Sequence, residues 1–197
     1  VQDVPSLERQ LVEAYLAENA DTSEATDVLR DTLTREVGKG EVPVLFEDDD
    51  DLGSCIDLGV RMLDTFIGKV PRPDLVLGTE VAFSLELTDG TTGEVLPLPL
   101  IGAIDALIVD NDNAQIWEFK TAKKKYGADV LEFDLQPTVY RMGARVHSVD
   151  NAAVTMIVTT KSKSPVVQIE NVNRTGHDEQ ELVEVAASVL RAVRAGV

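Results

Sequence analysis

A short polar segment near the middle of the chain constrains the fold most strongly. Residues 111–113 read Asn-Asp-Asn and lie between two apolar runs, 96–109 and 114–121. Asparagine and aspartate favour tight turns, so this pattern predicts a β-hairpin. Further runs of β-forming residues at 76–87, 152–160 and 166–172 predict three more strands. The chain is therefore expected to build a sheet rather than a purely helical bundle.

Apolar residues at helical spacing surround these strands. They predict helices at 7–16 (after an N-cap at Ser6), 23–37, 52–67, 134–146 and 180–195. The acidic run 47–51 precedes the third helix, where carboxylates suit a helix N-terminus; a ligand cage is the alternative interpretation. Three helices, three strands, a helix, two strands and a helix are typical of an α/β (mixed α+β) fold. In such a fold a central mixed sheet is flanked by helices.

The charge balance limits the partners of this chain. Among 197 residues, 35 are acidic and 18 basic, and the net charge of −17 argues against broad nucleic-acid binding. Residues 117–174, however, hold nine basic and six acidic side chains, so one positive face could accept a polyanion. The alternative is that the lysines at 123–125 form a solvated loop.

Cysteine content and hydropathy exclude several classes of protein. The single cysteine excludes an internal disulfide framework and a cysteine zinc cluster, and it favours a reducing, cytoplasmic setting. No apolar run approaches the roughly 20 residues that a membrane span needs, so we expect no membrane association.

Three charged side chains of the hairpin point to chemistry. Asp105 is the lone acid of an apolar strand, while Glu118 and Lys120 are two residues apart on the next strand and share one face. If the turn centres near residue 112, Asp105 lies opposite about residue 119 and diagonally near Glu118. Two converging carboxylates call for a cation, and oxygen ligands suit Mg²⁺ or Mn²⁺. A neighbouring ammonium can position hydroxide and offset charge on phosphorus, so the set favours phosphodiester hydrolysis.

The same residues have an alternative interpretation. Glu118 and Lys120 could form an exposed ion pair on the strand, with Asp105 facing solvent. Two further signals bear on the choice, because Gln136 and Tyr140 share one helical face and Glu80 is a single acid in the first apolar strand. Trp117 points to the opposite face from Glu118 and is expected to pack in the core.

Four short motifs follow one another in a characteristic order and spacing. They are Glu80-Val-Ala-Phe83, Gly102-Ala-Ile-Asp105, Glu118-Phe-Lys120-Thr121 and Gln136-Pro-Thr-Val-Tyr140. Together they resemble the RecB-like exonuclease branch of the PD-(D/E)XK nuclease superfamily over about residues 48–172. The resemblance implies a restriction-endonuclease-like core that cuts DNA with a divalent metal.

The resemblance also implies roles for individual residues. Asp105 and Glu118 would be metal-binding carboxylates, with the backbone carbonyl of Phe119 as a further ligand. Lys120 would be the catalytic lysine, and Glu80 would join the metal cluster or its surroundings.

A second group of residues would hold DNA. Gln136 and Tyr140 mark this branch of the family and would support the site and contact DNA. Lys123, Lys124 and Arg141 would follow the phosphate backbone.

One position departs from the family pattern. Many relatives carry a metal-binding histidine before the first strand, whereas Asp57 stands in the corresponding place here; it is either a ligand or a solvated helix acid. His147 and His177 lie outside every motif and receive no role.

These observations lead to a functional expectation. We expect one nuclease domain over 1–197, with an acidic helical segment (1–47), a core (48–172) and a C-terminal helix (173–197). It would be a Mg²⁺- or Mn²⁺-dependent deoxyribonuclease acting on linear ends or single strands in repair, recombination or phage DNA processing. A helicase, recombinase or single-strand-binding protein is a possible partner. The alternative is an inactive nuclease-fold module that binds DNA or a protein.

Overall fold

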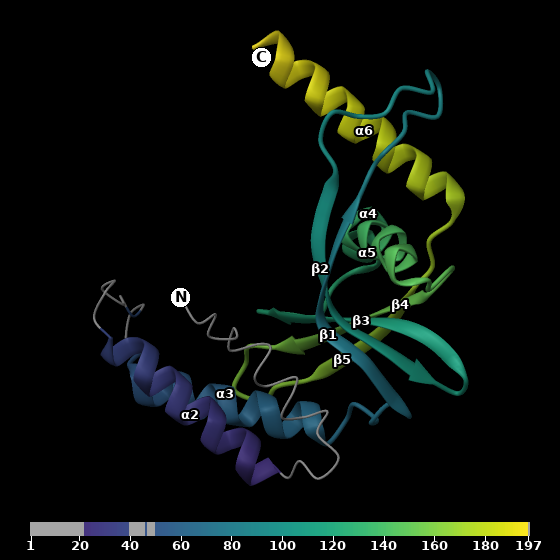
Figure 1. Ribbon diagram of the computed structural model, residues 1–197. Helices are drawn as coiled ribbons and strands as arrows, with labels where there is room; N and C mark the ends of the chain where they lie inside the picture. The colour runs from purple at the N-terminus through teal and green to yellow at the C-terminus, as the bar shows by residue number, and fades with distance from the viewer. Residues whose placement is uncertain (1–21, 40–45, 47–49, 197) are drawn as a thin grey trace. The chain divides into compact units, whose positions relative to one another are not determined.

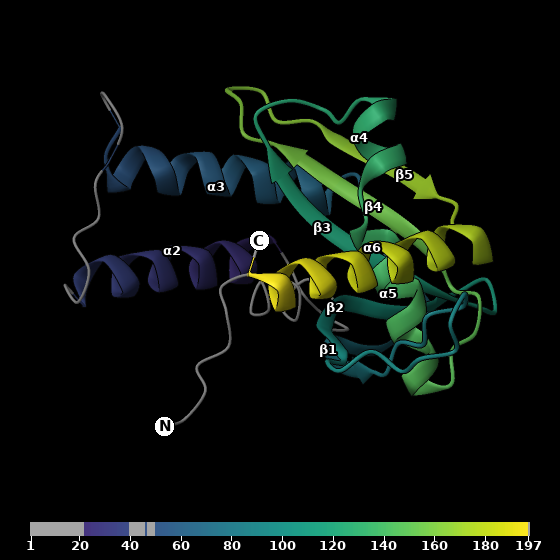
Figure 2. The ribbon, with the colours of Figure 1, turned by 90° about the horizontal axis from the view of Figure 1, so that it is seen from above.

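Five strands form one sheet in the order β1-β2-β3-β4-β5. The computed structural model describes residues 22–39, 46 and 50–196. The strands are β1 (Leu75–Leu85), β2 (Leu100–Asp110), β3 (Asn113–Ala122), β4 (Ala153–Thr160) and β5 (Val167–Val172). Figure 2 shows β3 and β4 pointing in the same direction and β5 in the opposite one, so the sheet is mixed.

The helices lie before, between and after these strands. They are α2 (Thr22–Gly38), α3 (Leu52–Ile67), α4 (Ala128–Phe133), α5 (Gln136–Ala144), the short 3₁₀ helix η1 (Arg145–His147) and α6 (Gly176–Ala195). Figure 1 shows this order along the chain. A mixed sheet flanked by helices is the fold class that the sequence predicted, and it is confirmed. The helix predicted at 7–16 lies outside the described residues.

The described chain divides into two compact units. The first comprises residues up to 72 together with 119–125 and 157–169, and the second comprises 73–118, 126–156 and 170 onward. Strands β3, β4 and β5 each contribute residues to both units. The single domain with three segments that the sequence suggested stays a prediction.

The first unit is built on the contact between α2 and α3. Ala25, Leu29 and Thr32 of α2 are buried at helical spacing. A Cβ placed on Gly59 of α3 would lie only 2.9 Å from a methyl carbon of Leu29, so the glycine permits this close approach. Asp51 caps α3, because its carboxylate accepts a hydrogen bond from the backbone N–H of Ser54 at 2.7 Å. The end of the acidic run is thus a helix start, as predicted, whereas residues 47–49 lie outside the described residues.

The second unit has its core between the β1–β2 hairpin and α5. Its buried members are Phe83, Ile104, Leu107, Ile116, Tyr140, Ala144, Ala152 and Val154. Trp117 is also buried, as the strand alternation predicted. Helix α6 adds Leu182 and Val183, which pack with Met142 of α5 and Leu87.

Two predicted element boundaries were wrong. The strand predicted from 96 begins at Leu100, because Pro97 and Pro99 lack the N–H that a ladder needs. Helix α6 begins at Gly176, four residues early, because Thr175 and Asp178 form a capping box.

The helix predicted at 134–146 is divided, and a short helix precedes it. Helix α5 begins only at Gln136, where the backbone N–H donates to the Asp134 carboxylate at 2.9 Å, and its C-terminal end passes into η1. Helix α4 was not predicted, since six residues are too few to show helical periodicity.

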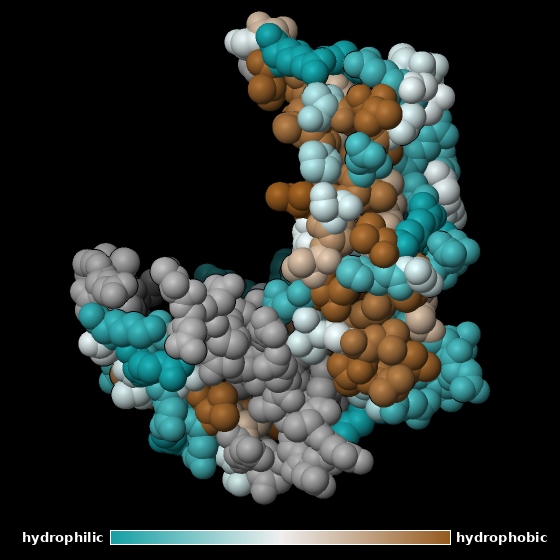
Figure 3. Space-filling view, viewed as in Figure 1, coloured by the Kyte–Doolittle hydropathy of each residue, from teal (hydrophilic) through white to brown (hydrophobic). Residues whose placement is uncertain are grey.

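Some apolar side chains remain on the surface. Val189 and Val193 of α6 are 55% and 66% exposed, and Figure 3 shows apolar surface beside the C-terminal end of this helix. None of the described helices is long and apolar enough to cross a membrane.

Candidate active site

The register of the β2–β3 hairpin positions the two predicted metal ligands. Asp110 pairs with Asn113 across a two-residue turn, and the ladder continues to Ala106 and Trp117. Asn111 and Asp112 both have positive φ, 49° and 61°, which is typical of a type I′ hairpin turn. Asp105 and Glu118 are the next residues on their strands.

Continued by one residue, this register sets Asp105 directly opposite Glu118. Directly opposite residues of an antiparallel pair point to the same face, with Cβ atoms about 5 Å apart. The predicted register was therefore off by one residue, because the turn centres between 111 and 112 rather than near 112. The correction brings the two carboxylates closer than the diagonal arrangement would.

Glu118 is a buried carboxylate. Its side chain is 1% exposed, which excludes the exposed strand ion pair of the alternative interpretation. Its Oε2 atom is buried and accepts no hydrogen bond from the described residues, although the carboxylate does have polar neighbours. Burial of a carboxylate is unfavourable unless cations or hydrogen-bond donors compensate the lost hydration. The burial of Glu118 therefore lowers the free energy of unfolding.

The hydroxyl of Tyr140 on α5 interacts with both carboxylates. Burial raises the pKa of its hydroxyl far above the usual range, and the negative charges of Glu118 and Asp105 raise it further. The hydroxyl is also hydrogen-bonded to the Glu118 carboxylate. The charges of both acids thus act on this one hydroxyl, in agreement with the register that sets Asp105 opposite Glu118.

Gln136 completes a chain of hydrogen bonds toward the acids. Its Nε2 donates to the Tyr140 hydroxyl oxygen at 2.6 Å, one helical turn further along α5. The tyrosine O–H is then free to donate toward Glu118, and a buried donor chain of this kind fixes the orientation of the carboxylate. The two residues that the sequence placed on one helical face are thus joined to each other and to Glu118.

The side chain of Phe83, the last residue of the first motif, packs against the first residue of the second motif, Gly102. A Cβ added to Gly102 would lie 2.7 Å from Cζ of this ring, and one added to Gly143 of α5 would lie 2.6 Å from its Cδ1. The ring also packs edge-on against Tyr140, with centroids 6.5 Å apart. A side chain at position 102 would thus clash with the Phe83 ring, so glycine is required there, three residues before Asp105.

Lys120 and Phe119 follow Glu118 on β3. Lys120 is partly buried and, two residues from Glu118 on the same strand, points to the same side of β3. The side chain of Phe119 instead packs edge-on against Phe66 of α3, with ring centroids 5.6 Å apart. The ligand role that the family resemblance implied for the backbone carbonyl of Phe119 stays a prediction.

Glu80 has an unusual backbone conformation. Its φ is +48°, in the left-handed region, and it lies between the pairs Thr79–Ala106 and Val81–Ile104. It is thus level with Asp105 on the neighbouring strand. A left-handed glutamate costs on the order of 1–2 kcal/mol, and such strain is concentrated at functional sites.

Glu80 and Asp57 do not complete a larger acidic cluster. Among the described residues, no three His, Cys, Asp or Glu side chains come together in a group that could hold a metal ion. Asp57 is exposed on α3. The ligand roles of both residues stay predictions, and the structure itself brings together only the pair Asp105 and Glu118.

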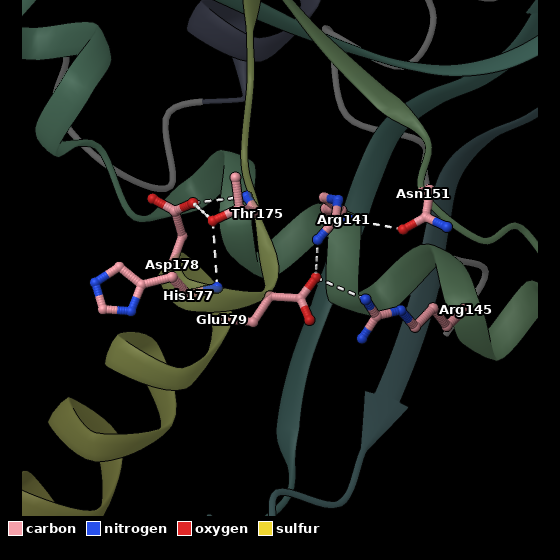
Figure 4. Close-up of polar contacts among 7 residues, drawn as sticks. All are labelled: Arg141, Arg145, Asn151, Thr175, His177, Asp178 and Glu179. Atoms are coloured by element: carbon pink, nitrogen blue, oxygen red, sulfur yellow. Dashed lines mark hydrogen bonds and ion pairs between the residues drawn. The ribbon is translucent and has the colours of Figure 1, made fainter.

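Arg141 has a structural partner. Its guanidinium pairs with Glu179 of α6 and donates to Asn151 at 2.7 Å, while Arg145 donates to the same Glu179 oxygen at 2.7 Å (Figure 4). The side chains of Arg141 and Glu179 are each 12% exposed. The contact of Arg141 with DNA stays a prediction, and no pattern in the sequence predicted this ion pair between residues 38 positions apart.

Comparison with known proteins identifies the family. The family model described as the PD-(D/E)XK nuclease superfamily matches residues 7–197. The chain belongs to the PD-(D/E)XK nuclease superfamily. The superfamily that the four motifs indicated is therefore confirmed, whereas the RecB-like branch stays a prediction.

Individual proteins were also compared with the chain. No curated protein matches the chain. Among solved structures, the chain is similar to a candidate exonuclease from Eubacterium rectale, with 14% identity and a TM-score of 0.48. That match covers 100% of this chain and 70% of the other.

Proposed function

We propose that this member of the PD-(D/E)XK superfamily is a divalent-metal-dependent deoxyribonuclease that acts on linear ends or single strands. The observation that carries the proposal is the hairpin register, which continued by one residue sets Asp105 opposite the buried carboxylate of Glu118. Family membership supports hydrolysis of a phosphodiester bond. The choice of DNA, and a role in repair, recombination or phage DNA processing, rest on the motif resemblance.

The donor set fits a hard divalent cation. Mg²⁺ is commonly held by one or two carboxylates and keeps several waters, so Asp105 and Glu118, with the carbonyl of Phe119, suffice as protein ligands. When bound, such an ion would lower the pKa of a coordinated water and polarise the phosphoryl oxygen. Mn²⁺ suits the same ligands.

The chain's own residues supply orientation and charge. The hydrogen bonds from Gln136 to Tyr140 and from Tyr140 to Glu118 hold one carboxylate in a fixed direction. Lys120, on the same side of β3 as Glu118, would place its ammonium where negative charge develops on the phosphate during attack. The role of Lys120 is thus electrostatic, and its removal should lower kcat more than substrate affinity.

The test uses the whole chain and labelled DNA. Linear and circular substrates, single- and double-stranded, are incubated with Mg²⁺, with Mn²⁺ or with EDTA. Lys120→Ala and Asp105→Asn are compared with matched controls, Lys69→Ala and Glu86→Gln, which change exposed residues outside the site. We expect metal-dependent degradation by the parent and the controls, and a loss of at least 100-fold in the two site variants.

Other outcomes would change the assignment. Binding of DNA without cleavage in every metal would indicate the inactive module instead. Cleavage that survives Asp105→Asn would show that the carboxylate pair is not the catalytic centre. Degradation of linear but not circular DNA would support action at ends.

A further inference from the structure

The basic residues of segment 117–174 fall into two groups with different surroundings. The three arginines are held by intramolecular partners. Arg141 and Arg145 pair with Glu179, and Arg174 donates through Nη2 to three backbone carbonyls of residues 131–134 at 2.8–3.0 Å. These contacts of the arginines lie within the second unit, whereas the lysines of the segment lie in the first.

The lysines lie in two segments of the first unit that contain no acidic residue. Residues 119–125 and 157–169 together hold six lysines and neither aspartate nor glutamate, in a chain whose net charge is −17. Five of them are exposed, and among the described residues none of the five forms an ion pair. We call these five the lysine patch: Lys123, Lys124, Lys125, Lys161 and Lys163.

A backbone hydrogen bond joins the two halves of the patch. The N–H of Lys161 donates to the carbonyl of Ala122 at 2.7 Å, so the β4–β5 turn lies beside the loop that follows β3. Figure 2 shows the two loops leaving the same end of the sheet. Lysines that are about 40 residues apart in sequence are therefore neighbours on one surface.

The β4–β5 turn is held in shape by its own hydrogen bonds. The Thr160 hydroxyl, on a buried residue, accepts from the N–H of Val166 at 2.9 Å. The N–H of Thr160 donates to the Val166 carbonyl at 3.0 Å, and the Ser162 hydroxyl donates to the Ser164 carbonyl at 2.8 Å. A turn fixed in this way presents its lysines with little further loss of conformational entropy on binding.

We propose that the lysine patch, with Lys161 and Lys163 as its second half, binds the phosphate backbone of the nucleic-acid substrate. This inference rests on the proposed nuclease function and adds a binding site to it. Like charges gathered on an otherwise acidic protein repel one another and are stabilised by a polyanion. Lysine suits this role, since its ammonium binds phosphate as a mobile point charge without reading bases.

The patch begins within reach of the bond to be cut. Lys123 is five residues from Glu118 along the chain, so their Cα atoms are at most about 17 Å apart. Nucleic acid bound at Lys123 would therefore lie within this chain distance of Glu118. Binding there should affect the KM for DNA more than kcat.

The test measures salt-dependent binding by the full chain. A fluorescein-labelled 30-nucleotide single strand and its duplex are titrated in EDTA, which prevents cleavage, at several KCl concentrations. The test variant is Lys161→Ala/Lys163→Ala, and the reference for the first half is Lys123→Ala/Lys124→Ala. The matched control is Lys39→Ala/Lys69→Ala, which removes two exposed lysines from the same unit but outside the patch.

The expected changes follow from counterion release. Loss of two phosphate contacts should reduce the slope of log K against log salt by about 1.4 for single strands, and weaken binding in 0.1 M salt by about 25-fold. Lys161→Arg/Lys163→Arg should retain both affinity and slope, because charge rather than base recognition is required. The control should bind DNA with the affinity and salt slope of the parent. All variants should have the melting temperature of the parent.

The outcomes separate this inference from the proposed function. If Lys161→Ala/Lys163→Ala keeps the parental slope while Lys123→Ala/Lys124→Ala loses it, the second half of the patch does not bind and the inference fails, with the nuclease function intact. If the parent neither binds nor cleaves any DNA tested, the proposed function fails as well. A raised KM with unchanged kcat in the Lys161→Ala/Lys163→Ala variant would support the inference under turnover conditions.

Discussion

Replacing Gly102 by alanine tests the packing that positions Asp105. The added Cβ would lie 2.7 Å and 2.9 Å from two ring carbons of Phe83, well inside van der Waals contact. The ring has little room to move, because it also lies against Gly143, where an added Cβ would be 2.6 Å away. The clash therefore has to be absorbed by the backbone of β2 or α5.

The expected cost follows from these distances. Overpacking a dense core costs about 1–3 kcal/mol, and the clamped ring places this case at the upper end. Removal of a glycine from a strand returns about 0.5–1 kcal/mol of conformational entropy. The net loss should be about 2 kcal/mol, which for a chain of this length lowers the melting temperature by about 4–8 °C.

Thermal unfolding followed by circular dichroism measures this loss. Gly90→Ala is the control, since nothing lies within 4 Å of its added Cβ, and it should leave the melting temperature nearly unchanged. Phe83→Leu combined with Gly102→Ala should recover part of the loss relative to the two single changes, because the smaller side chain makes room. A melting temperature of Gly102→Ala equal to or above that of the parent would refute the argument that Phe83 requires glycine at this position.

Three further changes probe the site and its support. Tyr140→Phe removes a hydrogen bond to the buried carboxylate of Glu118 and should cost about 1.5–3 kcal/mol in urea unfolding, together with a loss of nuclease activity. Glu179→Ala leaves its two arginine partners without their carboxylate and should cost about 3 kcal/mol by the same assay; a cost below 1 kcal/mol would contradict a buried pair. Hydrogen bonds from Thr175 lower the pKa of Asp178, so this carboxylate stabilises the fold above its ordinary pKa and the contribution is lost as pH falls through the lowered value. Unfolding measured between pH 6 and pH 2 should therefore show a shallower loss of stability on acidification for Asp178→Asn than for the parent.

Local patterns were sufficient to predict most of the fold. The β2–β3 hairpin was predicted from Asn111 and Asp112, because these residue types tolerate the positive φ that the turn requires. Helix α3 was predicted with its acidic start, and Asp51 indeed caps it. These features depend on residues within a few positions of one another, and such interactions are visible in sequence.

Features set by distant contacts could not be predicted in the same way. The early start of α6 depends on a reciprocal cap between Thr175 and Asp178, and a threonine alone does not determine it. The ion pair of Arg141 with Glu179 joins two helices that sequence spacing cannot relate. From sequence, Arg141 was therefore assigned to a phosphate contact, and its pairing with Glu179 became visible only in the packing of α5 against α6.

The candidate site lies between these two cases. Asp105, Glu118 and Tyr140 were singled out because an isolated acid in an apolar strand and an amide–hydroxyl pair on one helical face are unusual without a partner. Their convergence, however, depends on a register that one residue of error in the turn would alter, and on α5 covering the hairpin through Phe83. The buried carboxylate of Glu118 lowers the free energy of unfolding whether or not metal is present. A cation bound at this position would raise the free energy of unfolding again. Removal of the charge, for example by Glu118→Gln, should therefore stabilise the metal-free protein while abolishing any metal-dependent increase in its melting temperature.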